Sequence, residues 1–100
     1  MTLRPRERSR TAAEAVAVSA LAFLASDDER LERFVALAGI DTGRIREIAG
    51  QPEFLAAVMD HLMSEEALLL AFAANEGLRP EDVVRAAHAL GAGPWERDHA

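Results

Sequence analysis

The sequence predicts an all-α protein, a compact bundle of five or six short helices in which the first and fifth helices are central. Capping residues followed by acids recur in front of apolar stretches, and this is the pattern of helix N-termini. Within the stretches, apolar residues repeat at spacings of three and four, and none alternates with the period of a strand. The short linkers between them favour antiparallel neighbours in one bundle.

Capping boxes predict the first two helices. Residues 11–14 read Thr-Ala-Ala-Glu, so we expect the first helix over residues 11–25, nearly all apolar and largely buried. Residues 1–10 carry four arginines and are expected to form a disordered basic arm. Residues 26–29 read Ser-Asp-Asp-Glu and predict a second helix, which ends at Gly39 because glycine readily adopts the left-handed conformation.

Proline and glycine mark the third and fourth helices. A short third helix is expected to carry Ile45 and Ile48 and to close at Gly50. Pro52 then opens the fourth helix, at the position where its missing N–H group costs no hydrogen bond.

The fifth stretch is the most informative. Ser64 is expected to cap it, residues 67–74 contain no polar side chain, and Gly77 ends it. A helix that is apolar on every side indicates a buried position. Pro80 opens the sixth helix. The expected single helical domain therefore covers residues 11–91, and residues 92–100 are expected to form a flexible tail.

The charge is unevenly distributed. All eleven basic residues are arginines, four of them within the first ten positions; beyond these, seven arginines face sixteen acids. An acidic body repels phosphate backbones, so we expect no specific nucleic acid partner. No segment reaches the roughly 20 apolar residues of a membrane helix, so we expect no membrane partner. The absence of cysteine excludes thiol chemistry and fits a cytoplasmic location.

No group of residues in the sequence has the pattern of a catalytic or metal site. His61 and Glu65 have a four-residue spacing, but the expected helix break at Ser64 separates them. The sequence Glu-x-x-His at residues 96–99 occurs once, whereas a di-iron bundle needs two such units. We therefore expect no catalytic residues, no metal and no cofactor, and the protein is not expected to be an enzyme.

A helix-turn-helix arrangement of the fifth and sixth helices is the alternative function. Ala73, Gly77 and Val83 have suitable offsets for such a unit. The second helix would begin with Glu81 and Asp82, however, and these acids would face the DNA phosphates.

The chain resembles one family of short bacterial proteins, the domain of unknown function 3572. The resemblance covers about residues 11–91. It is carried by the segments Ala-Leu-Ala-Phe-Leu-Ala at 20–25, Arg-Phe-Val-Ala-Leu-Ala-Gly-Ile at 33–40, Pro-x-Phe-Leu-Ala-Ala-Val at 52–58, Glu-Ala-Leu-Leu-Leu-Ala-Phe-Ala-Ala at 66–74, and Gly-Leu-x-Pro-Glu at 77–81. It implies a helical fold and no named activity.

The leading hypothesis is a small, non-catalytic protein–protein interaction module or adaptor with an unidentified protein partner and an undetermined oligomeric state. Its expected contact residues lie where the fourth and fifth helices join: Met59, His61, Met63, Glu65 and Glu66. Methionines adapt to apolar partners, and acids steer basic ones. Core packing of the methionines and capping by the acids explain the same residues equally well.

Overall fold

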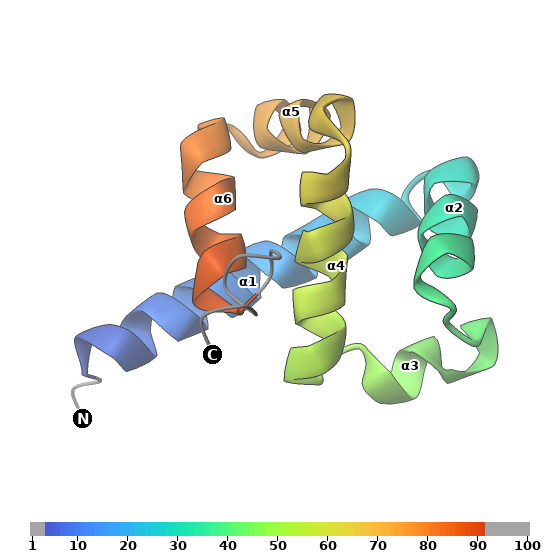
Figure 1. Ribbon diagram of the computed structural model, residues 1–100, viewed down its shortest axis with the longest axis horizontal. Helices are drawn as coiled ribbons and strands as arrows, with labels where there is room; N and C mark the ends of the chain where they lie inside the picture. Colours follow the sequence, from blue (N-terminus) through green and yellow to red (C-terminus); the bar gives the residue numbers. More distant parts are fainter. Residues whose placement is uncertain (1–3, 92–100) are drawn as a thin grey trace.

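The computed structural model describes residues 4–91 and confirms the all-α class. Within that range the chain forms six α-helices and one short 3-10 turn, and no strand (Figure 1). The helices are α1 (Pro5–Ala25), α2 (Asp28–Ala38), α3 (Ile45–Ile48), α4 (Pro52–Ser64), α5 (Glu66–Glu76) and α6 (Pro80–Ala89), and the 3-10 turn is η1 (Thr42–Arg44).

The first helix begins earlier than the capping box predicts. It starts at Pro5, which occupies the first turn, and the N–H of Arg8 already donates to the carbonyl of Arg4 at 2.9 Å. Thr11 therefore lies inside the helix and caps nothing. The arginines that precede it are good helix formers, and Glu7 is favourably placed at the positive end of the helix dipole. Residues 1–3 of the expected arm, and the whole expected tail at 92–100, lie outside the described residues.

Both serines that were expected to cap helices bond to the preceding helix instead. Asp27 caps α2 and accepts hydrogen bonds from the backbone N–H groups of Glu29 and Arg30. The Ser26 hydroxyl donates back to the carbonyl of Phe23 at 2.7 Å. Ser64 is likewise the last residue of α4, with its hydroxyl donating to the carbonyl of His61 at 2.6 Å. A hydroxyl satisfies a carbonyl at a C-terminus as readily as an N–H at an N-terminus.

The expected glycine and proline signals are confirmed. Gly39 and Gly77 end α2 and α5 in the left-handed conformation, with φ angles of 69° and 70°. A side chain at either position would strain the backbone. Pro52 and Pro80 open α4 and α6.

The centre of the bundle consists of α1 and α4. The expectation for α1 is confirmed, since it presents to α4 and α6 a buried stripe at helical spacing: Ala13, Ala17, Ala20, Phe23 and Leu24. The largest buried set belongs to α4: Phe54, Leu55, Val58, Met59, His61 and Leu62.

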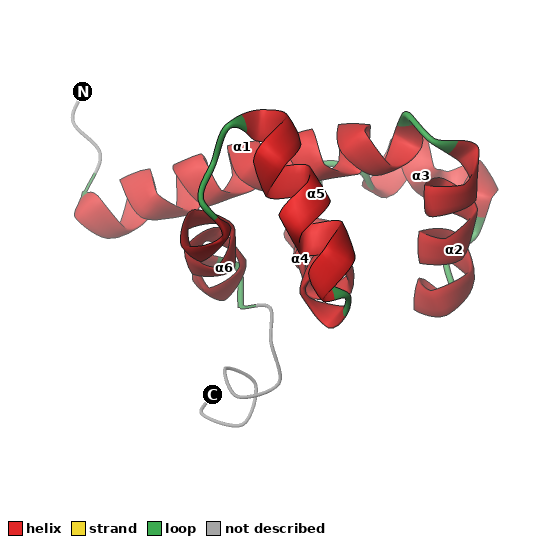
Figure 2. Ribbon diagram, turned by 90° about the horizontal axis from the view of Figure 1, so that it is seen from above, coloured by secondary structure: helices red, strands yellow, loops and turns green. Residues whose placement is uncertain are grey.

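The central position expected for the fifth helix is wrong. Only Phe72 and Ala73 of α5 are buried, and 45% of Leu70 is exposed. Figure 1 shows why: α5 lies across one end of α4 and α6 and packs through one side, an arrangement that Figure 2 shows from above. Its remaining apolar side chains lie at the surface or half-buried, so apolar character on every side does not require burial on every side.

Phe72 anchors α5 to the core. Its ring lies 5.5 Å from that of Phe23 in α1, and its side chain is fully buried. We expect Phe72→Ala to lower the free energy of unfolding by about 3–5 kcal/mol, because the truncation leaves a cavity as well as losing transfer energy. Chemical denaturation measures this change.

The matched control on the same helix is Leu70→Ala. Because Leu70 is half-exposed, its truncation should cost roughly 1 kcal/mol or less. A loss below about 1 kcal/mol for Phe72→Ala would contradict the position of α5.

Candidate functional site

The two methionines of the predicted contact site do not form an exposed surface. The side chain of Met59 is fully buried in the core, so it cannot contact a partner in the folded protein. Met63 is partly buried and packs against the same core. The core explanation of the methionines therefore holds, because both point toward the centre of the bundle from an α4 that is buried on a broad face.

His61 lies at the boundary between the core and the surface. Only 9% of the residue is exposed, and its ring packs on Phe34 of α2 with the centroids 5.1 Å apart. Within residues 4–91, no side chain shares a hydrogen bond with the imidazole. The ring nonetheless lines two surface cavities. His61 is therefore a buried polar group whose hydrogen-bonding capacity is open to whatever fills them.

Glu65 forms an ion pair that could not be predicted from the sequence. The Nε of Arg33 donates to its Oε2 at 2.8 Å, linking α2 to the start of α5. The two residues are 32 positions apart, so no local spacing signals the contact. Glu66, the first residue of α5, is exposed. Of the five predicted residues, Met59 is thus fully buried, Met63 and Glu65 are half-buried, Glu66 is exposed, and His61 is buried but lines surface cavities.

Two cavities border α2 and α4. We call the first the basic pocket; it has a volume of about 240 Å³ and is lined by Arg30, Arg33, His61, Glu65, Ala67, Leu68 and Ala71. We call the second the α2–α4 groove; it has a volume of about 500 Å³ and is lined by Leu37, Ala38, Glu53, Ala56, Ala57, Asp60, His61 and Ser64. His61 belongs to both.

Burial and charge set the protonation of this region. Burial lowers the pKa of His61 below 6.5, and Arg33 lowers it further, while Glu65 and Asp60 oppose the shift. The hydrogen bond from Arg33 lowers the pKa of Glu65. At neutral pH the imidazole is therefore neutral, and one of its nitrogens donates while the other accepts.

The arrangement does not form a nucleophile and base pair. The Ser64 hydroxyl donates to the carbonyl of His61 rather than to its imidazole, so the histidine does not activate it. Across residues 4–91, no three His, Cys, Asp or Glu side chains lie close enough to hold a metal ion. What the region offers is two cavities with donors and acceptors on their walls.

The fold is a small helical bundle with cavities at its surface. Residues 10–93 match the family described as "Protein of unknown function (DUF3572)", and the chain belongs to that family. No curated protein and no solved structure matches the chain. In the part of the chain that the structure describes, no helix combines the length and apolar character needed to cross a bilayer.

The lowered pKa of His61 links proton binding to stability. Below about pH 6.5 the unfolded state binds a proton at this site more readily than the folded state does. The free energy of unfolding should therefore fall as the pH decreases from 6.5 through the lower folded pKa. NMR titration of the imidazole measures the folded pKa directly.

Two substitutions test the causes separately. Arg33→Gln removes a charge that lowers the pKa of His61 and should raise it, while Glu65→Gln removes a charge that raises this pKa and should lower it. If both variants shift the pKa in the same direction, the assigned contacts are incorrect.

Proposed function

We propose that this protein is a non-catalytic interaction module that binds an amphipathic, basic helix of a partner protein in the α2–α4 groove. We also propose that it works in the cytoplasm, which fits its lack of cysteine. The observation that carries the proposal is Leu37, which is 65% exposed beside a groove lined by three alanines and by acidic side chains.

The groove has the composition of a helix-binding surface. Ala56 and Ala57 of α4 line one wall, and Leu37 and Ala38 of α2 line the other. Small side chains let a partner helix approach closely, and an exposed leucine gives it an apolar contact. The base is rigid, because Phe34 packs on Phe54 and on His61 with centroid distances of 5.9 and 5.1 Å.

Charge supports a basic occupant. Glu53 and Asp60 line the α4 side of the groove. The body of the protein, beyond residue 10, carries sixteen acids and seven arginines. Complementary charge accelerates association and excludes acidic competitors. An amphipathic helix with lysines or arginines flanking its apolar face therefore fits this groove better than an acidic one.

A synthetic helix tests the proposal without a known partner. The probe is a fluorescein-labelled amphipathic peptide with leucines on one face and lysines on the other. We expect it to bind at least about tenfold more tightly than the same peptide with glutamates in place of the lysines. Fluorescence anisotropy measures both affinities.

Leu37→Glu separates apolar docking from simple charge attraction. It adds a negative charge, so charge attraction alone would strengthen binding of the lysine peptide; loss of the apolar contact should instead weaken it about tenfold or more. Val18→Glu is the matched control, because Val18 is 52% exposed and lies on α1, outside the groove. Equal or stronger binding by Leu37→Glu would refute this docking site.

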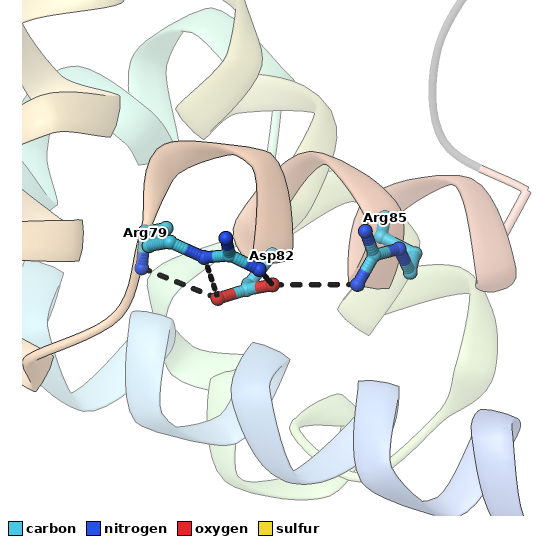
Figure 3. A network of polar contacts seen from close by, with 3 residues as sticks. All are labelled: Arg79, Asp82 and Arg85. Carbon is cyan, nitrogen blue, oxygen red and sulfur yellow. Dashed lines mark hydrogen bonds and ion pairs between the residues drawn. The ribbon is translucent and has the colours of Figure 1, made fainter.

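The alternative helix-turn-helix function is less well supported by the charges on α6. Figure 3 shows Arg79 and Arg85 on either side of Asp82, whose carboxylate bonds both at 3.3–3.4 Å. The hydrogen bond from Arg79 also lowers the pKa of Asp82, so its carboxylate stays ionised. The arginines that would contact phosphates are thus partly neutralised by this acid, and Glu81 adds a further negative charge.

We expect no sequence-specific binding to duplex DNA. The acidic body and Asp82 oppose approach of the phosphate backbone, so any binding should be weak and should disappear when residues 1–10 are deleted. Electrophoretic mobility shifts across a range of salt concentrations measure this. Submicromolar binding that survives the deletion would favour the DNA-binding alternative.

A further inference from the structure

We propose that the basic pocket binds a small monocarboxylate with a short apolar tail, and that Arg33, Arg30 and the first turn of α5 hold its carboxylate. This site is distinct from the groove described above, with which it shares only His61 among its lining residues, and the inference stands independently of the proposed partner helix. Three groups of donors converge on the pocket from α2, α4 and α5.

The two arginines supply most of the donors. Arg33 uses its Nε to bond Glu65, and its terminal nitrogens have no other recorded partner among the described residues. Arg30 stacks on the ring of Phe23, with its guanidinium carbon 4.6 Å from the centroid, and it lines both the basic pocket and a neighbouring cavity beside Phe23. No carboxylate in residues 4–91 forms an ion pair with Arg30. Stacking fixes the plane of a guanidinium and leaves its N–H edges available to an anion.

The start of α5 adds backbone donors. Glu65 stands at the cap position, but its carboxylate bonds Arg33 and does not cap the helix. The first intrahelical bond runs from the N–H of Leu69 to the carbonyl of Glu65. The N–H groups of Ala67 and Leu68, which both line the pocket, precede that bond and therefore lack an intrahelical acceptor. Uncapped N–H groups at a helix N-terminus attract anions.

His61 is an independent sign that the pocket receives a polar ligand. The residue is only 9% exposed, lines the pocket, and shares no hydrogen bond with a side chain among the described residues. Among the described residues no enclosed side-chain nitrogen or oxygen lacks a partner, so the imidazole nitrogens face the cavities that His61 lines, where water or a ligand can bond them. A neutral imidazole can donate to a carboxylate oxygen.

Charge and size select a monoanion. The two arginines and Glu65 leave one net positive charge around the pocket, which one carboxylate neutralises. A doubly charged phosphate would leave one uncompensated negative charge in the pocket, close to the carboxylate of Glu65. The volume of about 240 Å³ has room for a small organic anion, and Ala67, Leu68 and Ala71 give the pocket an apolar side. A short aliphatic acid matches both features.

Butyrate is the probe, and NMR detects its binding to the full-length protein. We expect saturable shifts of the Ala67 and Leu68 amide resonances with a millimolar dissociation constant, as suits so small a ligand. Butyramide has nearly the same shape without the charge and should cause no saturable shift. Inorganic phosphate at matched ionic strength should bind more weakly than butyrate.

Matched variants assign the residues. Arg33→Gln should weaken butyrate binding about tenfold, the scale of a lost charged hydrogen bond, whereas Arg85→Gln on α6 makes the same change in net charge and should not. Glu65→Gln should tighten binding severalfold, because it removes the carboxylate that competes for Arg33. Its control, Glu66→Gln, removes the same charge from the exposed first residue of α5 and should have a smaller effect.

Each contrary result overturns the proposal. Absence of saturation with butyrate, or equal binding of butyramide, would show that the pocket does not recognise a carboxylate. Tighter binding of phosphate than of butyrate would overturn the carboxylate class. Unchanged affinity in Arg33→Gln would place the bound anion elsewhere.

Discussion

Close packing of α1 against α4 and α6 is the constraint on which the other contacts depend. Ala13, Ala17 and Ala20 lie on one face of α1 and are at most 3% exposed, so backbones can approach closely along this stripe. The larger buried side chains of α1, Phe23 and Leu24, come at the C-terminal end of the helix, where Phe23 meets Phe72 of α5. Because the small side chains of this face allow close approach, the long helix α1 can pack against α2, α4 and α6 along its length.

The position of α2 follows from this support and creates both cavities. α2 reaches the core mainly through Phe34, which is fully buried between Phe54 and His61. A helix held mainly by one large aromatic leaves uncovered space beside it. The groove and the basic pocket both border α2, and His61 of α4 lines both. Segments with few buried contacts, such as α2, commonly contribute to binding surfaces.

Local sequence signals predicted where the helices begin and end more accurately than they predicted which helices are buried. Gly39, Gly77, Pro52 and Pro80 act through backbone geometry that a few neighbours determine, and the structure has each where the sequence placed it. The start of α1 was misplaced because a capping box also fits inside a helix that has no breaker before it. The central position of α5 failed for a different reason: tertiary packing, not composition, decides which apolar face is covered.

The residues of the candidate site were even harder to predict from local sequence signals. His61 and Glu65 could be named from the sequence, but Arg30 and Arg33 could not, since only the fold brings α2 to the start of α5. This contact changes the role of Glu65 from helix cap to ion-pair partner. Because its carboxylate bonds Arg33, Glu65 does not cap the first turn of α5, and its charge acts on the buried imidazole of His61 instead. A single tertiary contact thus sets both the donors and the charge of the pocket, and neither follows from the residues near Glu65 in the chain.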